Sequence, residues 1–237
     1  MLYHMKILFY SFLLGVLCTQ CIPASGQTNS IMRMASPQLR QFVSRHPQAD
    51  QVLSNALSQS FSNRSVQIFY FYTDDKSVAR ACHYYPSESV VGICIKENQA
   101  TLDGYISLLY ETLNSQNESK FEELFRKATA GEISQPDFSH EMSRLEFMAT
   151  IKTRDLLKSM KFSKSEKSDS ECWIKYRDCP EKFEDFLAYC VKVSPSQDIT
   201  HAYYADYNML RADALATQTN CLSGSNSFRT QQQAVMQ

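Results

Sequence analysis

The stretch Leu102-Asp103-Gly104-Tyr105-Ile106-Ser107-Leu108-Leu109-Tyr110-Glu111-Thr112-Leu113-Asn114 decides the fold that we expect. At about 100° per residue, one helical face collects the apolar side chains Leu102, Tyr105, Ile106, Leu109 and Leu113. Asp103, Tyr110 and Asn114 form a polar stripe at the edge of that face, and Glu111 points nearly opposite. The β-rich run 90–96 comes just before this stretch, so the pattern predicts a helix packed under a sheet.

Period-2 patterns before this helix and helical patterns after it predict the rest of the fold. Strands are expected at 65–72, 77–85 and 89–96, with a turn at Pro86-Ser87. Helices are expected at 99–115, 118–130, 136–160, 180–193 and 197–218, after two short helices near 36–61, and the charged segment 161–170 is expected to be a loop. Three successive strands favour an antiparallel meander. We therefore expect an α+β fold: a small antiparallel sheet packed by a mostly helical C-terminal two-thirds and stapled by disulfides.

The N-terminus has the three parts of a signal peptide. Lys6 supplies the basic region, 7–17 the apolar region, and Ala24-Ser25-Gly26 a small-residue cleavage site before Gln27. The apolar run is shorter than the roughly 20 residues that cross a bilayer. We expect residues 1–26 to be removed, leaving a secreted or periplasmic chain without a membrane span.

Composition places the remainder as one domain, 27–221, followed by a polar, flexible tail, 222–237. The whole chain has 24 basic and 25 acidic residues, a net charge of −1, which argues against a nucleic-acid partner. Six glycines leave little room for a phosphate-binding loop, and no nucleotide fingerprint is present. We expect no cofactor.

An even number of cysteines behind a signal peptide indicates disulfides. Those beyond residue 26 are Cys82, Cys94, Cys172, Cys179, Cys190 and Cys221. Cys82 and Cys94 lie almost symmetrically about the turn at Pro86-Ser87, as a cross-strand pair would. A zinc site is the alternative for these cysteines, but no Cys-x-x-Cys occurs among them, so we expect no metal.

The remaining four cysteines leave two arrangements open. Cys179 and Cys190 flank an expected helix, which would hold them roughly 16 Å apart at about 1.5 Å per residue. A disulfide needs α-carbons within about 7 Å. The arrangements are Cys172–Cys179 with Cys190–Cys221, or Cys172–Cys190 with Cys179–Cys221.

Two sequons, beginning at Asn63 and Asn117, are candidate glycosylation sites.

The histidines indicate no compact metal pair: His83, His140 and His201 are far apart in sequence. The aromatic run Tyr203-Tyr204-Tyr207 has two interpretations. We favour packing of its rings over the sheet or over the cysteine-linked helix, with the hydroxyls reaching water, over an exposed face for a protein or glycan.

The segment Tyr110-Glu111-Thr112-Leu113-Asn114, placed after a strand and before a helix that carries Glu146, resembles a degenerate zincin metallopeptidase core over roughly residues 65–160. Zincins carry His-Glu-x-x-His on the first active helix. The two histidines hold zinc and the glutamate polarises the metal-bound water. In gluzincins a downstream glutamate completes the ligand set, and Glu146 stands at that place here.

Both histidine positions depart from the family, to Tyr110 and Asn114, and neither side chain replaces a neutral imidazole as a zinc ligand. The resemblance therefore implies a pseudoenzyme. The preferred function is an exported non-catalytic module that binds an unknown protein or glycan. The alternatives are a peptidase-like hydrolase using Glu111 and Glu146, with Tyr110, Asn114 and Asp103 lining its pocket, and a structural envelope or extracellular component. Without a site, Glu111 would be solvated and Glu146 would belong to a structural pair.

Overall fold

The computed structural model describes residues 36–60, 64–72, 81–87, 89–97, 99, 101–193 and 203–216. The expected signal segment 1–26, the sequon residue Asn63, the cysteine Cys221 and the tail 222–237 lie outside the described residues. The described part is a mixed α and β structure with a three-stranded sheet and many helices, as the sequence predicts at this coarse level.

The sheet contains β1 (Ser65–Phe71), β2 (Ala81–Ser87) and β3 (Val90–Lys96) in the order β1-β3-β2. β2 and β3 pair antiparallel, but β1 and β3 pair parallel. The expected antiparallel meander is therefore wrong. β3 is a nearly continuous apolar run that suits a central strand buried on both faces. Pro86 has no N–H to donate and belongs in an edge strand, and the β2–β3 register is irregular between Tyr84 and Ser87.

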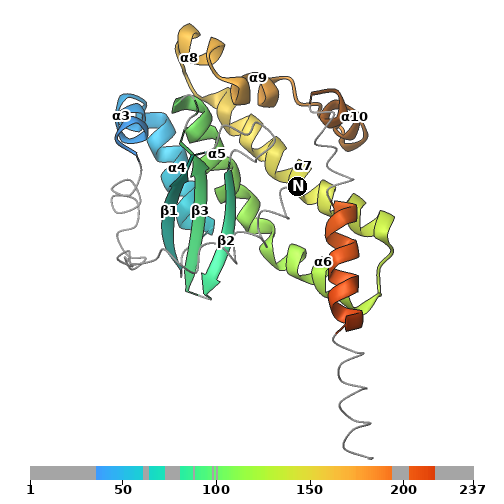
Figure 1. The fold of residues 1–237 in the computed structure, drawn as a ribbon. Helices are drawn as coiled ribbons and strands as arrows, with labels where there is room; N and C mark the ends of the chain where they lie inside the picture. The colour runs from blue at the N-terminus through green and yellow to red at the C-terminus, as the bar shows by residue number, and fades with distance from the viewer. Residues whose placement is uncertain are drawn as a thin grey trace, which may run out of the picture.

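Figure 1 shows the helices gathered behind and beside the sheet. They are α3 (Pro37–Arg45), α4 (Pro47–Ser60), α5 (Thr101–Asn114), the 3₁₀ turn η1 (Ser115–Asn117), α6 (Glu118–Ala130), α7 (Gln135–Ser159), α8 (Lys164–Ser168), α9 (Glu171–Arg177), α10 (Phe183–Val193) and an unlabelled helix at 203–216. Two short helices, α8 and α9, lie where a loop or no element was expected. Ser163 and Glu166 form a capping box that starts α8.

Helix α5 is the central element of the fold. It packs against β2, β3, α3, α4, α7 and α9, and from Leu102 to Asn114 only Gly104 and Tyr110 are not fully buried. The main apolar cluster lies between α5, the inner face of the sheet and α3–α4. A second cluster joins α6, α7 and helix 203–216, and a third joins α7 and α10.

The cysteines differ from the disulfide scheme that the sequence predicts. No disulfide joins any two of the five cysteines in the described part of the chain. α10 begins only at Phe183, so the helical separation assumed for Cys179 and Cys190 does not apply, and both lie in the third apolar cluster. Burial raises the pKa of the Cys179 thiol to about 11, which keeps this sulfur protonated and unreactive.

Glu166 ties α8 to the α3–α4 corner, and we expect this contact to depend on acid pH. Burial alone would raise the pKa of Glu166, but hydrogen bonds from the hydroxyl and amide of Ser163 and from His46 outweigh it and lower the pKa to about 2. A carboxyl whose pKa is lower in the folded chain stabilises it above the unfolded pKa, and this stabilisation disappears as the pH falls through the folded value.

Urea unfolding of the natural chain and Glu166→Gln therefore measures this contribution directly. We expect the natural chain to be more stable above about pH 5 and the difference to vanish as the pH falls to about 2. Glu122→Gln, on the exposed face of α6, is the control and is expected to show no such trend. A difference that does not change across this range would refute the assignment.

Candidate functional site

Glu146, on the inner side of α7, accepts three hydrogen bonds although it is only 5% exposed. The donors are the Tyr110 hydroxyl, the Asn114 amide nitrogen Nδ2 at 3.1 Å and the Tyr203 hydroxyl at 3.0 Å. Tyr110 and Asn114 lie four residues apart on α5, so they face α7 from successive turns. The structure thus brings together three residues that the sequence singles out.

Glu111 follows Tyr110 on α5, about 100° further around the helix, and is 2% exposed. Its Oε2 is 2.7 Å from Nδ1 of His83 on β2, and the second ring nitrogen of His83 is 3.4 Å from Oε2 of Glu118. An imidazole with both nitrogens facing carboxylate oxygens donates to both when it is doubly protonated. Glu111 is therefore not solvated as an ordinary amphipathic helix would leave it, because the edge strand covers that side of α5.

Tyr176 of α9 packs beside Tyr110. Its ring centroid is 5.9 Å from that of Tyr110. Burial raises the pKa of Tyr176 well above its ordinary value, and the charges of Cys172, Glu111 and Glu146 raise it further. The phenol therefore stays neutral beside the two carboxylates. We refer to the following residues as the carboxylate cluster: His83, Tyr110, Glu111, Asn114, Glu118, Glu146, Tyr176 and Tyr203.

Asp103 was expected beside these residues but lies in another place. It is buried, and its carboxylate accepts hydrogen bonds from the Ser170 hydroxyl and, at 3.0 Å, from the Cys172 backbone N–H. Ser170 is the N-cap of α9. Asp103 therefore fixes the start of α9 on α5, a structural role that suits a carboxylate at a helix N-terminus.

In helix 203–216, Tyr203 and Tyr207 pack within the protein as expected, but neither over the sheet nor over the cysteine-bearing helix α10. Tyr203 reaches Glu146, and the Tyr207 hydroxyl donates to the Ile133 carbonyl at 2.9 Å while its ring lies 5.7 Å from that of Phe138. These rings lie over α6 and α7, and their hydroxyls reach protein acceptors instead of water. Arg211 also donates to the Thr129 carbonyl at 2.8 Å, which holds the helix beside α6.

The sequence alone did not assign His83, Glu118, Tyr176 or Tyr203 to this site. The signal for His83 is its register: it pairs with Ile93, whose side chain is on the buried inner face of the sheet. Tyr176 and Tyr203 come from segments distant in sequence, and no local pattern indicates which carboxylate they approach.

The second sequon is also part of this region. Asn117 is 4% exposed, and its Nδ2 donates to the Leu145 carbonyl at 3.3 Å. A glycan on this nitrogen is incompatible with that buried contact.

The residues at the candidate zinc position do not fit a zinc ion. Tyr110 and Asn114 bring an O–H and an N–H to Glu146, where a metal site requires lone pairs. Among the residues that the structure describes, no group of three or more His, Cys, Asp or Glu side chains is arranged to hold a metal.

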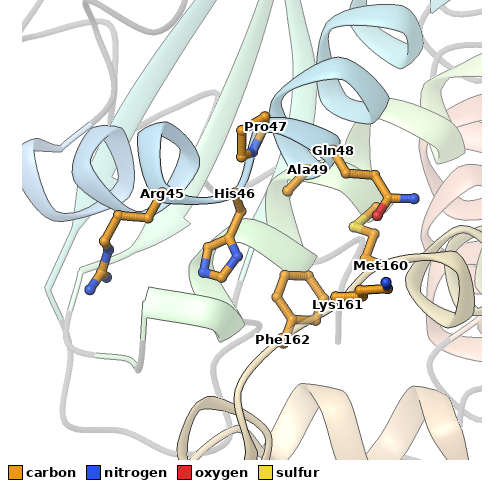
Figure 2. Close-up of a pocket in the computed structure, with 8 residues that line it drawn as sticks. All are labelled: Arg45, His46, Pro47, Gln48, Ala49, Met160, Lys161 and Phe162. Carbon is orange, nitrogen blue, oxygen red and sulfur yellow. The ribbon is translucent and has the colours of Figure 1, made fainter.

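A hollow near the surface lies in another part of the molecule. It has a volume of about 220 Å³ and is lined by Arg45, His46, Pro47, Gln48, Ala49, Met160, Lys161 and Phe162. Figure 2 shows His46 beside Phe162 and the Arg45 side chain directed away from the ring pair. At about 1.5 Å per residue, Met160 lies about 20 Å along α7 from Glu146.

Comparisons with protein-family models, with curated proteins and with solved structures give no match for this chain. Within the described ranges, no helix has the length and apolar character needed to span a membrane.

The His83–Glu111 contact is expected to behave as a coupled buried pair. His83→Leu leaves the Glu111 carboxylate buried without its donor, and we expect the free energy of unfolding to fall by about 3–5 kcal/mol. In the double variant His83→Leu/Glu111→Leu no charge is left uncompensated at this contact, so the loss should be smaller than that of His83→Leu alone. Urea unfolding of the complete mutant cycle measures the coupling.

Glu118→Gln is the matched control because Glu118 is partly exposed and 3.4 Å from the ring. We expect it to cost no more than about 1 kcal/mol. Additive effects of the two leucine substitutions would show that His83 and Glu111 do not depend on each other.

Proposed function

We propose that this protein is an exported, non-catalytic binding module on a zincin-like scaffold that has lost its zinc ligands. The observation that carries the proposal is the contact of Tyr110 and Asn114 with Glu146. These are the residues at the two histidine positions and at the downstream glutamate position of the resemblance. If a zinc site loses its cation and its histidines, the residues at the former ligand positions can still meet and be joined by hydrogen bonds.

The Asn114 nitrogen and the nearer Glu146 oxygen are 3.1 Å apart, an ordinary hydrogen-bond distance. Hydrogen bonds from the two tyrosines and Asn114 satisfy the Glu146 carboxylate, which would otherwise be a costly buried charge.

The burial of Glu111 and its contact with His83 argue against peptidase chemistry. In a zincin the equivalent glutamate polarises a metal-bound water. Here Glu111 is 2% exposed and its Oε2 contacts His83 at 2.7 Å. A general base must be within hydrogen-bond reach of the proton that it removes, and this carboxylate is already engaged by the edge strand.

Metal analysis of the purified natural chain tests the loss of the zinc site. After incubation with zinc and removal of the excess, we expect no stoichiometric zinc. One zinc per chain that disappears in Glu146→Gln would contradict the proposal. For the binding role, saturable binding to a glycan array or to the organism's own extracellular proteins should be unchanged by a metal chelator.

A second candidate is a hydrolase, and the buried His83–Glu111 pair is the observation that favours it. A histidine oriented by a carboxylate is a common general acid or base. Hydrolysis of unstructured peptides by the purified chain, abolished by both His83→Asn and Glu111→Gln, would favour this candidate over the binding module. We expect no such activity.

Export is part of the same proposal and has its own test. The chain expressed with its N-terminus intact should be recovered outside the cytoplasm, with Gln27 as its first residue. Recovery of a cytoplasmic chain that still begins at Met1 would contradict export without affecting the zincin-like ancestry.

A further inference from the structure

Two cysteines outside the carboxylate cluster lie opposite each other on neighbouring strands. Cys82 of β2 and Cys94 of β3 are direct partners in the antiparallel register, and each is 1% exposed. Directly opposite residues of paired strands project from the same face of the sheet. Successive residues project from opposite faces, so the pair lies on the face away from His83 and Glu111.

The register meets the geometric requirement for a disulfide. Opposed residues in an antiparallel pair have α-carbons about 5.5 Å apart in the hydrogen-bonded arrangement and about 4.5 Å apart in the other. Both values fall within the range of about 4.4–6.8 Å that disulfides span. The register therefore places the two α-carbons at a separation that a disulfide can span.

We infer that Cys82 and Cys94 form a disulfide when the chain folds in the presence of a small-molecule disulfide oxidant. One cysteine thiolate attacks the oxidant, forms a mixed disulfide and releases one thiol. The other thiolate attacks the protein sulfur of that mixed disulfide and releases the second thiol. The two protein thiols lose two protons and two electrons, and the oxidant is reduced to two thiols.

Burial determines when this reaction takes place. Thiol–disulfide exchange requires access of the oxidant to a thiolate. With both residues 1% exposed, the bond forms during folding, before β2 and β3 are closed against the rest of the domain. The resulting cross-link fastens β2, the edge strand that carries His83, to the central strand. The inference rests on the strand register alone and does not depend on the proposed function.

The protease sites of the chain allow a direct test. Cys82 and Cys94 share the tryptic peptide 81–96, whereas Cys172, Cys179, Cys190 and Cys221 each fall in a different tryptic peptide. The chain is refolded with oxidised and reduced glutathione, denatured, alkylated without reduction and digested. We expect peptide 81–96 to be unalkylated and two hydrogen atoms lighter than the dithiol form. Cleavage after Glu88 should give two fragments that separate only on reduction.

Two results would overturn the inference: peptide 81–96 carrying two alkyl groups, or Cys82 or Cys94 linked to any other peptide. A stability measurement is independent of the digestion. The refolded chain should have a higher urea midpoint before reduction than after it. Cys82→Ser/Cys94→Ser should lose this shift, and Cys172→Ser, the matched control, should keep it. Retention of the whole shift in the double variant would also count against the pair.

Discussion

Replacement of Glu146 by alanine is expected to lower the free energy of unfolding by about 3–5 kcal/mol, one of the largest effects of any single substitution in this chain. The carboxylate is the common acceptor for Tyr110, Asn114 and Tyr203. Its removal leaves these donors without their acceptor in a buried region, at about 1–3 kcal/mol for each donor that finds no water, and also creates a cavity.

Urea unfolding of Glu146→Ala and Glu141→Ala makes the comparison within one helix. Glu141 is exposed and pairs with His140 and Arg144 at the surface, so its substitution should change stability by no more than about 0.5 kcal/mol. Glu146→Gln keeps the side-chain volume and should cost less than alanine, because it removes the charge but not the packing. A loss below about 1 kcal/mol for Glu146→Ala would mean that the three hydrogen bonds do not hold α5, α7 and helix 203–216 together.

The periodicity of the chain predicts its local structure well. The β-branched and aromatic residues of 65–71 and the apolar run of β3 define strands, and the apolar stripe of α5 defines the central helix. Periodicity does not predict the order of the strands, because that order depends on which strand can lie at the edge of the sheet. Pro86 in β2 carries that information, and with it the middle position of β3 follows.

The site likewise has a part that the sequence predicts and a part that depends on how the helices pack. The four-residue spacing of Tyr110 and Asn114 predicts that they share a side of α5, which the structure shows. Asp103 is on the same stripe but two turns away, where α9 uses it as a cap. The partners from other segments, Tyr176 and Tyr203, depend on how α9 and helix 203–216 pack, and no local pattern encodes that packing.

The double substitution Tyr110→His/Asn114→His is expected to create a zinc site in this scaffold. It converts Tyr110-Glu111-Thr112-Leu113-Asn114 into His-Glu-x-x-His, with two imidazoles in place of the donors that now meet Glu146. Two histidines and one glutamate are a complete set of protein ligands for a zinc ion with one open position. Zinc should then raise the thermal midpoint of the variant, because a ligand that binds only the folded chain stabilises it.

Three matched chains isolate this effect: the natural chain, the double variant, and the double variant with Glu146→Gln. All three must first show the same circular dichroism as the natural chain, so that loss of folding is separated from loss of binding. Zinc should stabilise the double variant alone, and the third chain should bind it much more weakly because one of its ligands is neutral.

The most direct measurement is the zinc content of these three chains after equilibration with zinc and removal of the excess. The account predicts about one zinc ion per chain in Tyr110→His/Asn114→His and none bound stoichiometrically in the other two. A folded double variant that retains no zinc, or retains it equally after Glu146→Gln, would contradict the inherited metal cradle.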